Sequence, residues 1–171
     1  SLAIYDLYGK KLNSKSIKAL IPANQLTYCF TAEMPSGFPS LYLVRLTLSE
    51  GEKVLSQNDY WKSTGDVSGF KSFNDLSEPD LRVKEIKQKN GRVLFVVSNT
   101  DKLPAIGLKF NLRDAETKKT ILPAYFSEGY FTLLPGEKKQ VEVNRADSGI
   151  QNTEVIFEGY NLKPQILFGI D

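Results

Sequence analysis

The 171-residue sequence contains no histidine, a single cysteine and a single tryptophan. The lack of histidine excludes Ser-His-Asp and Cys-His catalytic arrangements and most zinc sites, which need an imidazole as base or ligand. The lone Cys29 excludes a disulfide framework and a thiol-based metal site within this chain. Because Cys29 lies between aromatic residues in "LTYCFTAE", we expect a buried and unreactive thiol. A phosphate-binding glycine loop and an EF-hand loop are also missing, so we expect no metal and no other cofactor.

Charge and hydropathy give no support for two further kinds of partner. The chain has 22 basic and 20 acidic residues, and its net charge of +2 gives no reason to expect binding to nucleic acid or to an anionic membrane surface. No apolar run approaches the roughly 20 residues that a membrane-spanning helix needs. The sequence starts at "SLAIYDLYG", without Met or a signal peptide, so we expect a piece excised from a longer protein.

The dominant pattern in the chain is an alternation of apolar and polar residues. It is clear in "LTYCFTA" (26–32), "LYLVRLTLS" (41–49), "LKFNLRD" (108–114) and "KQVEVNR" (139–145). One-sided alternation is typical of antiparallel sheets with one face on a core, and no segment shows a sustained helical period. We therefore predict an all-β fold with two immunoglobulin-like antiparallel β-sandwiches, at 1–66 and 79–171, the first of them N-terminally truncated.

Turn residues support this prediction. "AIYDLYGKKL", "RLTLSEGEKVL" and "NLRDAETKKTIL" each place a polar turn between two apolar strands, as hairpins do. Ser, Gly, Asp and Lys dominate "KSTGDVSGFKSFNDLSEPD", so we expect an interdomain connection at 67–78. Phe70 and Phe73 within it are too apolar for a free linker, and we expect them to pack against one or both domains.

The first domain contains fewer strands than an immunoglobulin-like sandwich needs. We predict five strands in it, at about 2–7, 15–21, 26–32, 41–48 and 53–60, whereas the sandwich needs about seven. Two leading strands would be missing, and apolar residues such as Ile4, Phe30 and Val44 would be uncovered. We expect the fragment to self-associate through its open sheet edge. The alternative is collapse onto the second domain through Phe70 and Phe73.

Two groups of residues could serve a site. Acidic residues such as Glu52 and Asp114 lie in turns or on outer faces of strands, so we interpret them as solvated surface and expect no catalytic residue. Trp61, Glu128 and Tyr130 are candidates for contact with a sugar or with another domain, since an exposed aromatic face suits the apolar face of a sugar ring. The competing interpretation makes Trp61 a core or interdomain residue and the aromatics of 125–131 core plus a docking loop.

Four distinctive segments follow one another along the chain: "QNDYWKS" (57–63), "FNDLSEPDLRV" (73–83), "SEGYFTLLPGEKKQVEV" (127–143) and "VIFEGYN" (155–161). Taken in this order, they resemble the C-terminal end of glycoside hydrolase family 2 enzymes, in the exo-β-glucosaminidase and β-mannosidase branch. The resemblance covers residues 41–161, and residues 1–40 fit it only generally. It implies a catalytic (β/α)8 barrel in the same polypeptide, followed by two immunoglobulin-like sandwiches. In "LLPGE", Pro135 and Gly136 predict a sharp turn between strands of the second sandwich.

The catalytic residues of that family do not carry over to this chain. Its general acid belongs to an Asn-Glu pair on a barrel strand, and no Asn-Glu dipeptide occurs here. The resemblance thus implies that the chain is the non-catalytic tail of a retaining β-glycosidase, in a periplasmic or secreted protein. We expect the tail to support the catalytic barrel and to help wall its substrate cleft. An independent carbohydrate-binding module, a protein-interaction pair of immunoglobulin-like domains and a catalytic domain are the alternatives.

Overall fold

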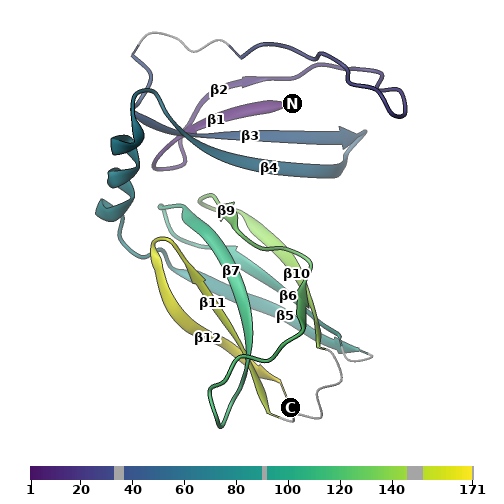
Figure 1. Cartoon of the computed structure of the whole chain (residues 1–171), viewed down its shortest axis with the longest axis vertical. Coiled ribbons are helices and arrows are strands. Elements are labelled where there is room, and N and C mark those ends of the chain that lie inside the picture. Colours follow the sequence, from purple (N-terminus) through teal and green to yellow (C-terminus); the bar gives the residue numbers. More distant parts are fainter. Residues whose placement is uncertain (33–36, 90–91, 146–151, 171) are drawn as a thin grey trace. The chain divides into compact units, whose positions relative to one another are not determined.

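A computed structural model describes residues 1–32, 37–89, 92–145 and 152–170 (Figure 1). The strands of these residues form three four-stranded sheets. All pairings between the strands are antiparallel. The all-β fold predicted from the alternating pattern is therefore confirmed. The chain folds as two compact units, Ser1–Ser72 and Phe73–Asp171.

The first unit contains a sheet with the strand order β2-β1-β3-β4. Its strands are β1 (Leu2–Asp6), β2 (Lys11–Lys15), β3 (Leu41–Glu50) and β4 (Lys53–Ser63). Tight hairpins join β1 to β2 and β3 to β4, and each turn has a glycine at positive φ, Gly9 at 82° and Gly51 at 58°. The Asp6 carboxylate accepts the backbone N–H groups of Tyr8 and Lys10 at 2.9 Å and so closes the first turn. Both hairpins agree with the sequence prediction.

One face of this sheet carries a small apolar cluster, formed by Leu2, Ile4, Tyr42 and the partly buried Phe30, Ala32, Phe38 and Val44. The prediction that Ile4, Phe30 and Val44 would be uncovered is wrong. Ile4 is 0% exposed, and the other two are partly buried. The reason is that Phe30, Ala32 and Phe38, which lie between β2 and β3 in the sequence, pack against this face.

The strands predicted at 15–21 and 26–32 do not form. β2 ends at Lys15, and no strand is present in residues 16–32. Pro22 cannot donate a ladder hydrogen bond, and Asn24 has a φ of 56°, which is incompatible with an extended strand. Of the alternating residues 26–32, only Phe30 and Ala32 pack on the sheet, whereas Leu26 and Tyr28 are exposed. The alternation here therefore marks neither a paired strand nor a buried face.

Cys29 is exposed, so the prediction of a buried thiol is wrong. The neighbouring Phe30 packs against the apolar cluster of the sheet, whereas Cys29 lines an open pocket together with Leu46 and Leu48 of β3. The thiol lies 3.7 Å from the carbonyl oxygen of Thr27. Aromatic neighbours in the sequence indicated burial, but they bury a residue only where the backbone turns that residue inward.

The opposite face of the first sheet holds a buried ion pair between β3 and β4. Arg45 Nε donates to Asp59 Oδ1 at 2.7 Å and Arg45 Nη2 donates to Oδ2 at 2.8 Å, a bidentate arrangement. The two side chains are only 6% and 10% exposed. The guanidinium also lies over the ring of Tyr5, 5.8 Å from its centroid. The charge of Arg45 is thus matched inside the structure, as a buried charge requires.

A 3₁₀ helix, η1 (Val67–Asp75), follows β4, and the expected connection at 67–78 falls across the boundary between the units. Phe73 is buried, and its ring centroid lies 5.0 Å from that of Tyr160 in the second unit. The Tyr160 hydroxyl donates to Asn74 Oδ1 at 3.2 Å. The prediction that this apolar stretch packs against folded structure is confirmed for Phe73.

The second unit is a β-sandwich with sheet orders β5-β6-β10-β8 and β12-β11-β7-β9 (Figure 1). Its strands are β5 (Leu81–Lys89), β6 (Arg92–Asn99), β7 (Ala105–Asp114), β8 (Ala124–Phe126), β9 (Phe131–Leu133), β10 (Lys138–Arg145), β11 (Thr153–Gly159) and β12 (Leu162–Ile170). Residues of both sheets form one core, in which the rings of Phe95 and Phe110 are 5.3 Å apart. A bridge between Arg113 and Thr120 closes the third predicted hairpin.

The "LLPGE" turn has the geometry that its sequence predicts. Gly136 has a φ of 78°, and the N–H of Glu137 donates to the carbonyl of Leu134 at 3.0 Å, as in a type II turn. Asn99 fixes the turn from β6. Its side-chain amide donates to the carbonyl of Leu133 at 2.8 Å, and its N–H donates to the carbonyl of Glu137 at 2.9 Å. The stretch is therefore architectural, as its sequence indicates.

Candidate functional site

Trp61, Glu128 and Tyr130, the residues singled out from the sequence, belong to different units. Trp61 lies in β4 of the first unit, opposite Leu43 of β3, and is partly buried. Glu128 and Tyr130 lie together in loop 127–130, which joins β8 to β9 in the second unit. The loop therefore gathers two of the candidates, and Trp61 is a residue of the first unit.

Loop 127–130 is anchored at both ends. The N–H of Ser127 donates to the carbonyl of Glu142 at 2.8 Å, and the Ser127 hydroxyl accepts the N–H of Glu142 at 2.9 Å. At the other end, Phe131 is buried in the core. Between these anchors, Tyr130 has a φ of 57°, which is uncommon for a residue with a side chain. Its side chain is 77% exposed, so a strained and anchored loop holds an aromatic ring in solvent.

The Tyr130 ring lies beside a charged cluster on the outer face of the β12-β11-β7-β9 sheet. Lys109 of β7 and Glu158 of β11 are direct cross-strand partners, with Nζ and Oε1 2.9 Å apart. Asn111 Nδ2 donates to the same oxygen at 3.0 Å. The Lys109 ammonium lies over the Tyr130 ring, 6.0 Å from its centroid. The hydrogen bond to Glu158, with the attraction of its charge, raises the pKa of Lys109, so this lysine is charged at neutral pH.

Glu128 contacts a lysine of the other sheet. Lys139 Nζ lies 3.3 Å from the Glu128 carboxylate and 5.5 Å from the centroid of the Phe131 ring. The two candidate residues of loop 127–130 are thus linked to one lysine in each sheet, Tyr130 to Lys109 and Glu128 to Lys139. This arrangement fixes the loop relative to both layers of the sandwich.

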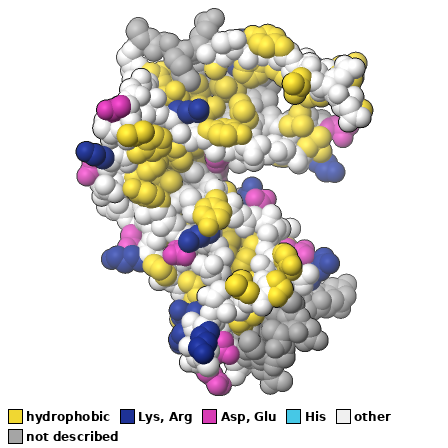
Figure 2. All heavy atoms as spheres, in the orientation of Figure 1, with side chains coloured by type: hydrophobic (Ala, Val, Ile, Leu, Met, Phe, Trp, Pro, Cys, Tyr) yellow, Lys and Arg dark blue, Asp and Glu magenta, His cyan; other side chains and the backbone are white. Residues whose placement is uncertain are grey.

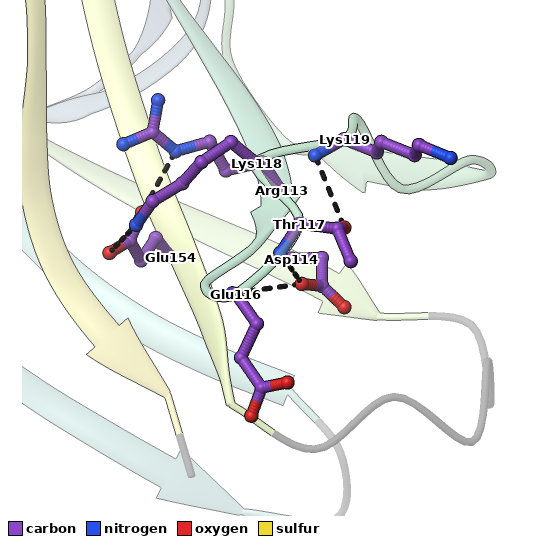
Figure 3. A network of polar contacts seen from close by, with 7 residues as sticks. All are labelled: Arg113, Asp114, Glu116, Thr117, Lys118, Lys119 and Glu154. Carbon is purple, nitrogen blue, oxygen red and sulfur yellow. Dashed lines mark hydrogen bonds and ion pairs between the residues drawn. The ribbon is translucent and has the colours of Figure 1, made fainter.

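A second polar network stabilises the turn that follows β7 (Figure 3). The Asp114 carboxylate accepts the N–H of Thr117 at 2.6 Å, and Glu154 of β11 accepts hydrogen bonds from Arg113 at 2.8 Å and Lys118 at 3.1 Å. The Thr117 N–H is the main cause of the lowered pKa of Asp114, and the Arg113 hydrogen bond is the main cause of the lowered pKa of Glu154. These carboxylates are structural anions that hold the turn against the sheet.

Within residues 1–32, 37–89, 92–145 and 152–170, no group of three or more metal-ligating side chains could hold a metal ion. In the same part of the chain, no helix has the length and apolar character that crossing a membrane would need.

The sequence did not single out Lys109, Asn111 or Glu158. The alternation in "LKFNLRD" places Lys109 and Asn111 on the face opposite the core, but it does not say what they meet. Asn111 and Glu158 are 47 positions apart in the chain, and their contact depends on the register between β7 and β11. A single sequence carries no signal for that register.

The two-sheet antiparallel sandwich of the second unit is of the immunoglobulin-like class. The chain belongs to the exo-β-D-glucosaminidase Ig-fold domain family, whose model matches residues 58–162. This membership confirms the resemblance to the immunoglobulin-like region of family 2 exo-β-glucosaminidases that the sequence motifs indicated. The chain is therefore an accessory immunoglobulin-like region of a glycoside hydrolase family.

Two relatives illustrate the similarity. An exo-β-D-glucosaminidase of Arthroderma benhamiae is 21% identical over 182 residues, which cover 96% of this chain and 20% of the relative. The crystal structure of the exo-chitosanase CsxA of Amycolatopsis orientalis matches with a TM-score of 0.70 and 20% identity, over 96% of this chain and 23% of that chain. A complex of a variant of the same exo-chitosanase with PNP-β-D-glucosamine matches equally well. The structural match establishes the fold, and this chain spans about a fifth of the length of these relatives.

Proposed function

We propose that this chain is the non-catalytic C-terminal accessory region of a retaining family 2 β-glycosidase and supports the catalytic barrel of the same polypeptide. The observation that carries the proposal is the membership in the exo-β-D-glucosaminidase Ig-fold family. This chain matches only about a fifth of the length of its relatives, so most of each relative lies outside the matched region. That agrees with an accessory region of a larger enzyme. A periplasmic or secreted location is part of the proposal.

Loop 127–130 is the surface that we assign to contact with the barrel, at the edge of its substrate cleft, where the Tyr130 ring would stay open to a glycan. Loops on a rigid sandwich commonly carry contact functions, and this one presents Glu128 and an exposed Tyr130 from fixed anchors. In the intact polypeptide, Tyr130→Ala should lower kcat/KM while the melting temperature stays within about a degree or two, because an exposed side chain contributes little to folding. A large loss of melting temperature with unchanged kinetics would make Tyr130 a folding residue and remove this assignment.

The reading frame that encodes the chain tests the proposal as a whole. We expect its upstream part to encode a signal peptide and a (β/α)8 barrel with an Asn-Glu pair at the end of a strand. A reading frame without such a barrel would overturn the proposal. It would favour the alternative, an independent carbohydrate-binding or protein-interaction module of immunoglobulin-like fold.

We further propose that the isolated chain self-associates through β4, which forms one edge of the first sheet. Val54, Leu55 and Tyr60 of β4 are all exposed, and Figure 2 shows hydrophobic side chains gathered on the surface of the first unit. An exposed strand edge with apolar side chains favours pairing with a second strand. Size-exclusion chromatography with light scattering should give a mass above the 19.2 kDa of the monomer. A monomer across micromolar concentrations would contradict this proposal.

A further inference from the structure

We propose that Tyr130, Lys109 and Glu158 form a binding site for a β-linked amino-sugar oligosaccharide on the outer face of the β12-β11-β7-β9 sheet. The inference rests on the proposed function for the choice of sugar. The site itself is defined by the contacts around Tyr130. It would give the accessory region a direct role in holding a glycan chain, beyond support of a barrel.

The Tyr130 ring is the platform of this site. It is 77% exposed, and loop 127–130 keeps it there although the backbone must adopt a φ of 57°. Phe131, the next residue, is buried in the core, whereas the Tyr130 ring lies beside Lys109 of the outer face. The C–H groups on one face of a pyranose ring can pack on such an aromatic surface without loss of the sugar's hydroxyl hydrogen bonds.

The polar groups beside the ring are held in place by one another, and they can still form further hydrogen bonds. Lys109 and Asn111 both bind Oε1 of Glu158, at 2.9 and 3.0 Å. The second oxygen, Oε2, accepts no hydrogen bond from the described residues, and the Glu158 side chain remains 27% exposed. Lys109 has three N–H donors, and its hydrogen bond with Glu158 uses one of them. The site thus offers an open carboxylate oxygen and ammonium donors to a sugar packed on Tyr130.

Charge favours an amino sugar over a neutral or acidic one. Lys109 is matched by Glu158, and the nearby Lys139 is matched by Glu128, so the loop region has no positive excess that would attract an anionic glycan. An ammonium group at the open Oε2 would form a charge-assisted hydrogen bond, which a hydroxyl group cannot equal. We therefore expect glucosamine oligomers to bind more tightly than glucose oligomers of the same linkage.

Titration of the 171-residue chain with a β-1,4-linked glucosamine tetramer, followed by calorimetry or ligand-observed NMR, tests the site. Tyr130→Asn removes the ring but suits the left-handed backbone, since asparagine is enriched there. We expect it to weaken binding about fivefold or more, the size of an aromatic stacking contribution. Tyr130→Phe should bind like the unmodified chain. Tyr125→Asn, at the similarly exposed tyrosine of β8, is the matched control and should leave binding unchanged.

A second variant tests the role of the carboxylate. Glu158→Gln keeps an oxygen for Lys109 and Asn111 but removes the negative charge, so the preference for the glucosamine tetramer over cellotetraose should disappear. The proposal is overturned if the unmodified chain binds neither tetramer at millimolar concentration, or if Tyr130→Asn binds as well as the unmodified chain with an unchanged melting temperature. Neither result would contradict the accessory role, because that role is tested by whether the reading frame encodes a catalytic barrel.

Discussion

The two units bury their apolar side chains to different extents. The second unit encloses its core between two sheets, and Phe95, Leu108 and Val141 in it are 0% exposed. The first unit has one described sheet, with a small cluster around Leu2 and Ile4. Most of the large apolar side chains that are exposed in the described residues also belong to the first unit. A sheet needs a second layer to bury its apolar face, so we expect the first unit to be the less stable of the two.

The largest effect should come from the core of the second unit. Phe95 contacts the rings of Phe110 and Phe168, at centroid distances of 5.3 and 5.1 Å. Phe95→Ala should lower the free energy of unfolding of this unit by about 3–5 kcal/mol through the cavity that it leaves. Hydrogen exchange as a function of denaturant can follow the two units separately. Equal loss of protection in both units would show that they unfold together and do not differ in stability.

Removal of one partner of the buried ion pair should weaken the first unit. Arg45→Met leaves the Asp59 carboxylate, which is 10% exposed, without its bidentate partner and should destabilise the unit by about 3 kcal/mol. The double variant Arg45→Met with Asp59→Leu should recover part of the loss, because no unpaired charge remains. Hydrogen exchange of β1–β4 is the measurement. A single variant as stable as the unmodified chain would mean that the pair contributes nothing to the first unit.

A pair of glycines tests how closely the second unit is packed. A Cβ at Gly159 would lie 2.8 Å from the carbonyl oxygen of Ile106, whereas a Cβ at Gly129 would meet no atom within 4 Å. Gly159→Ala should therefore cost about 1–3 kcal/mol of stability, as overpacking does, and Gly129→Ala should be close to neutral. Chemical denaturation gives both values. Equal effects would show that the close approach at Gly159 relaxes easily.

The smallest effect concerns acid pH. Folding lowers the pKa of Asp114 and Glu154 from usual values of 3.8 and 4.5. The stabilisation is therefore fully present above the unfolded-state values and is lost as the pH falls through the lower folded-state values. We expect the stability of the second unit to decline below about pH 4, and Glu154→Gln to make that decline shallower. A slope that is identical in the variant would contradict a contribution from Glu154.

The sequence predicted local features well and non-local ones poorly. The hairpin turns, the "LLPGE" turn and the core alternation of β7 follow from residues adjacent in the chain, and the structure has all of them. The segment 26–32 also alternates, but it forms no strand: Phe30 and Ala32 pack on the sheet, whereas Leu26 and Tyr28 are exposed. Alternation alone does not show whether a partner strand is available. The same difference holds for the site. Tyr130 could be predicted as a site residue because its loop is visible in the sequence. The Lys109–Glu158 contact could not be predicted, because it depends on the register of two strands.

Turnover of an aryl β-glucosaminide tests the central claim, that this chain is an accessory region without an active site of its own. The isolated chain and the intact polypeptide that contains it should be assayed side by side at equal molar concentration. We expect no hydrolysis by the isolated chain and hydrolysis by the intact polypeptide. Turnover by the isolated chain that a single Asp or Glu substitution abolishes would contradict the claim and place a catalytic site within these residues.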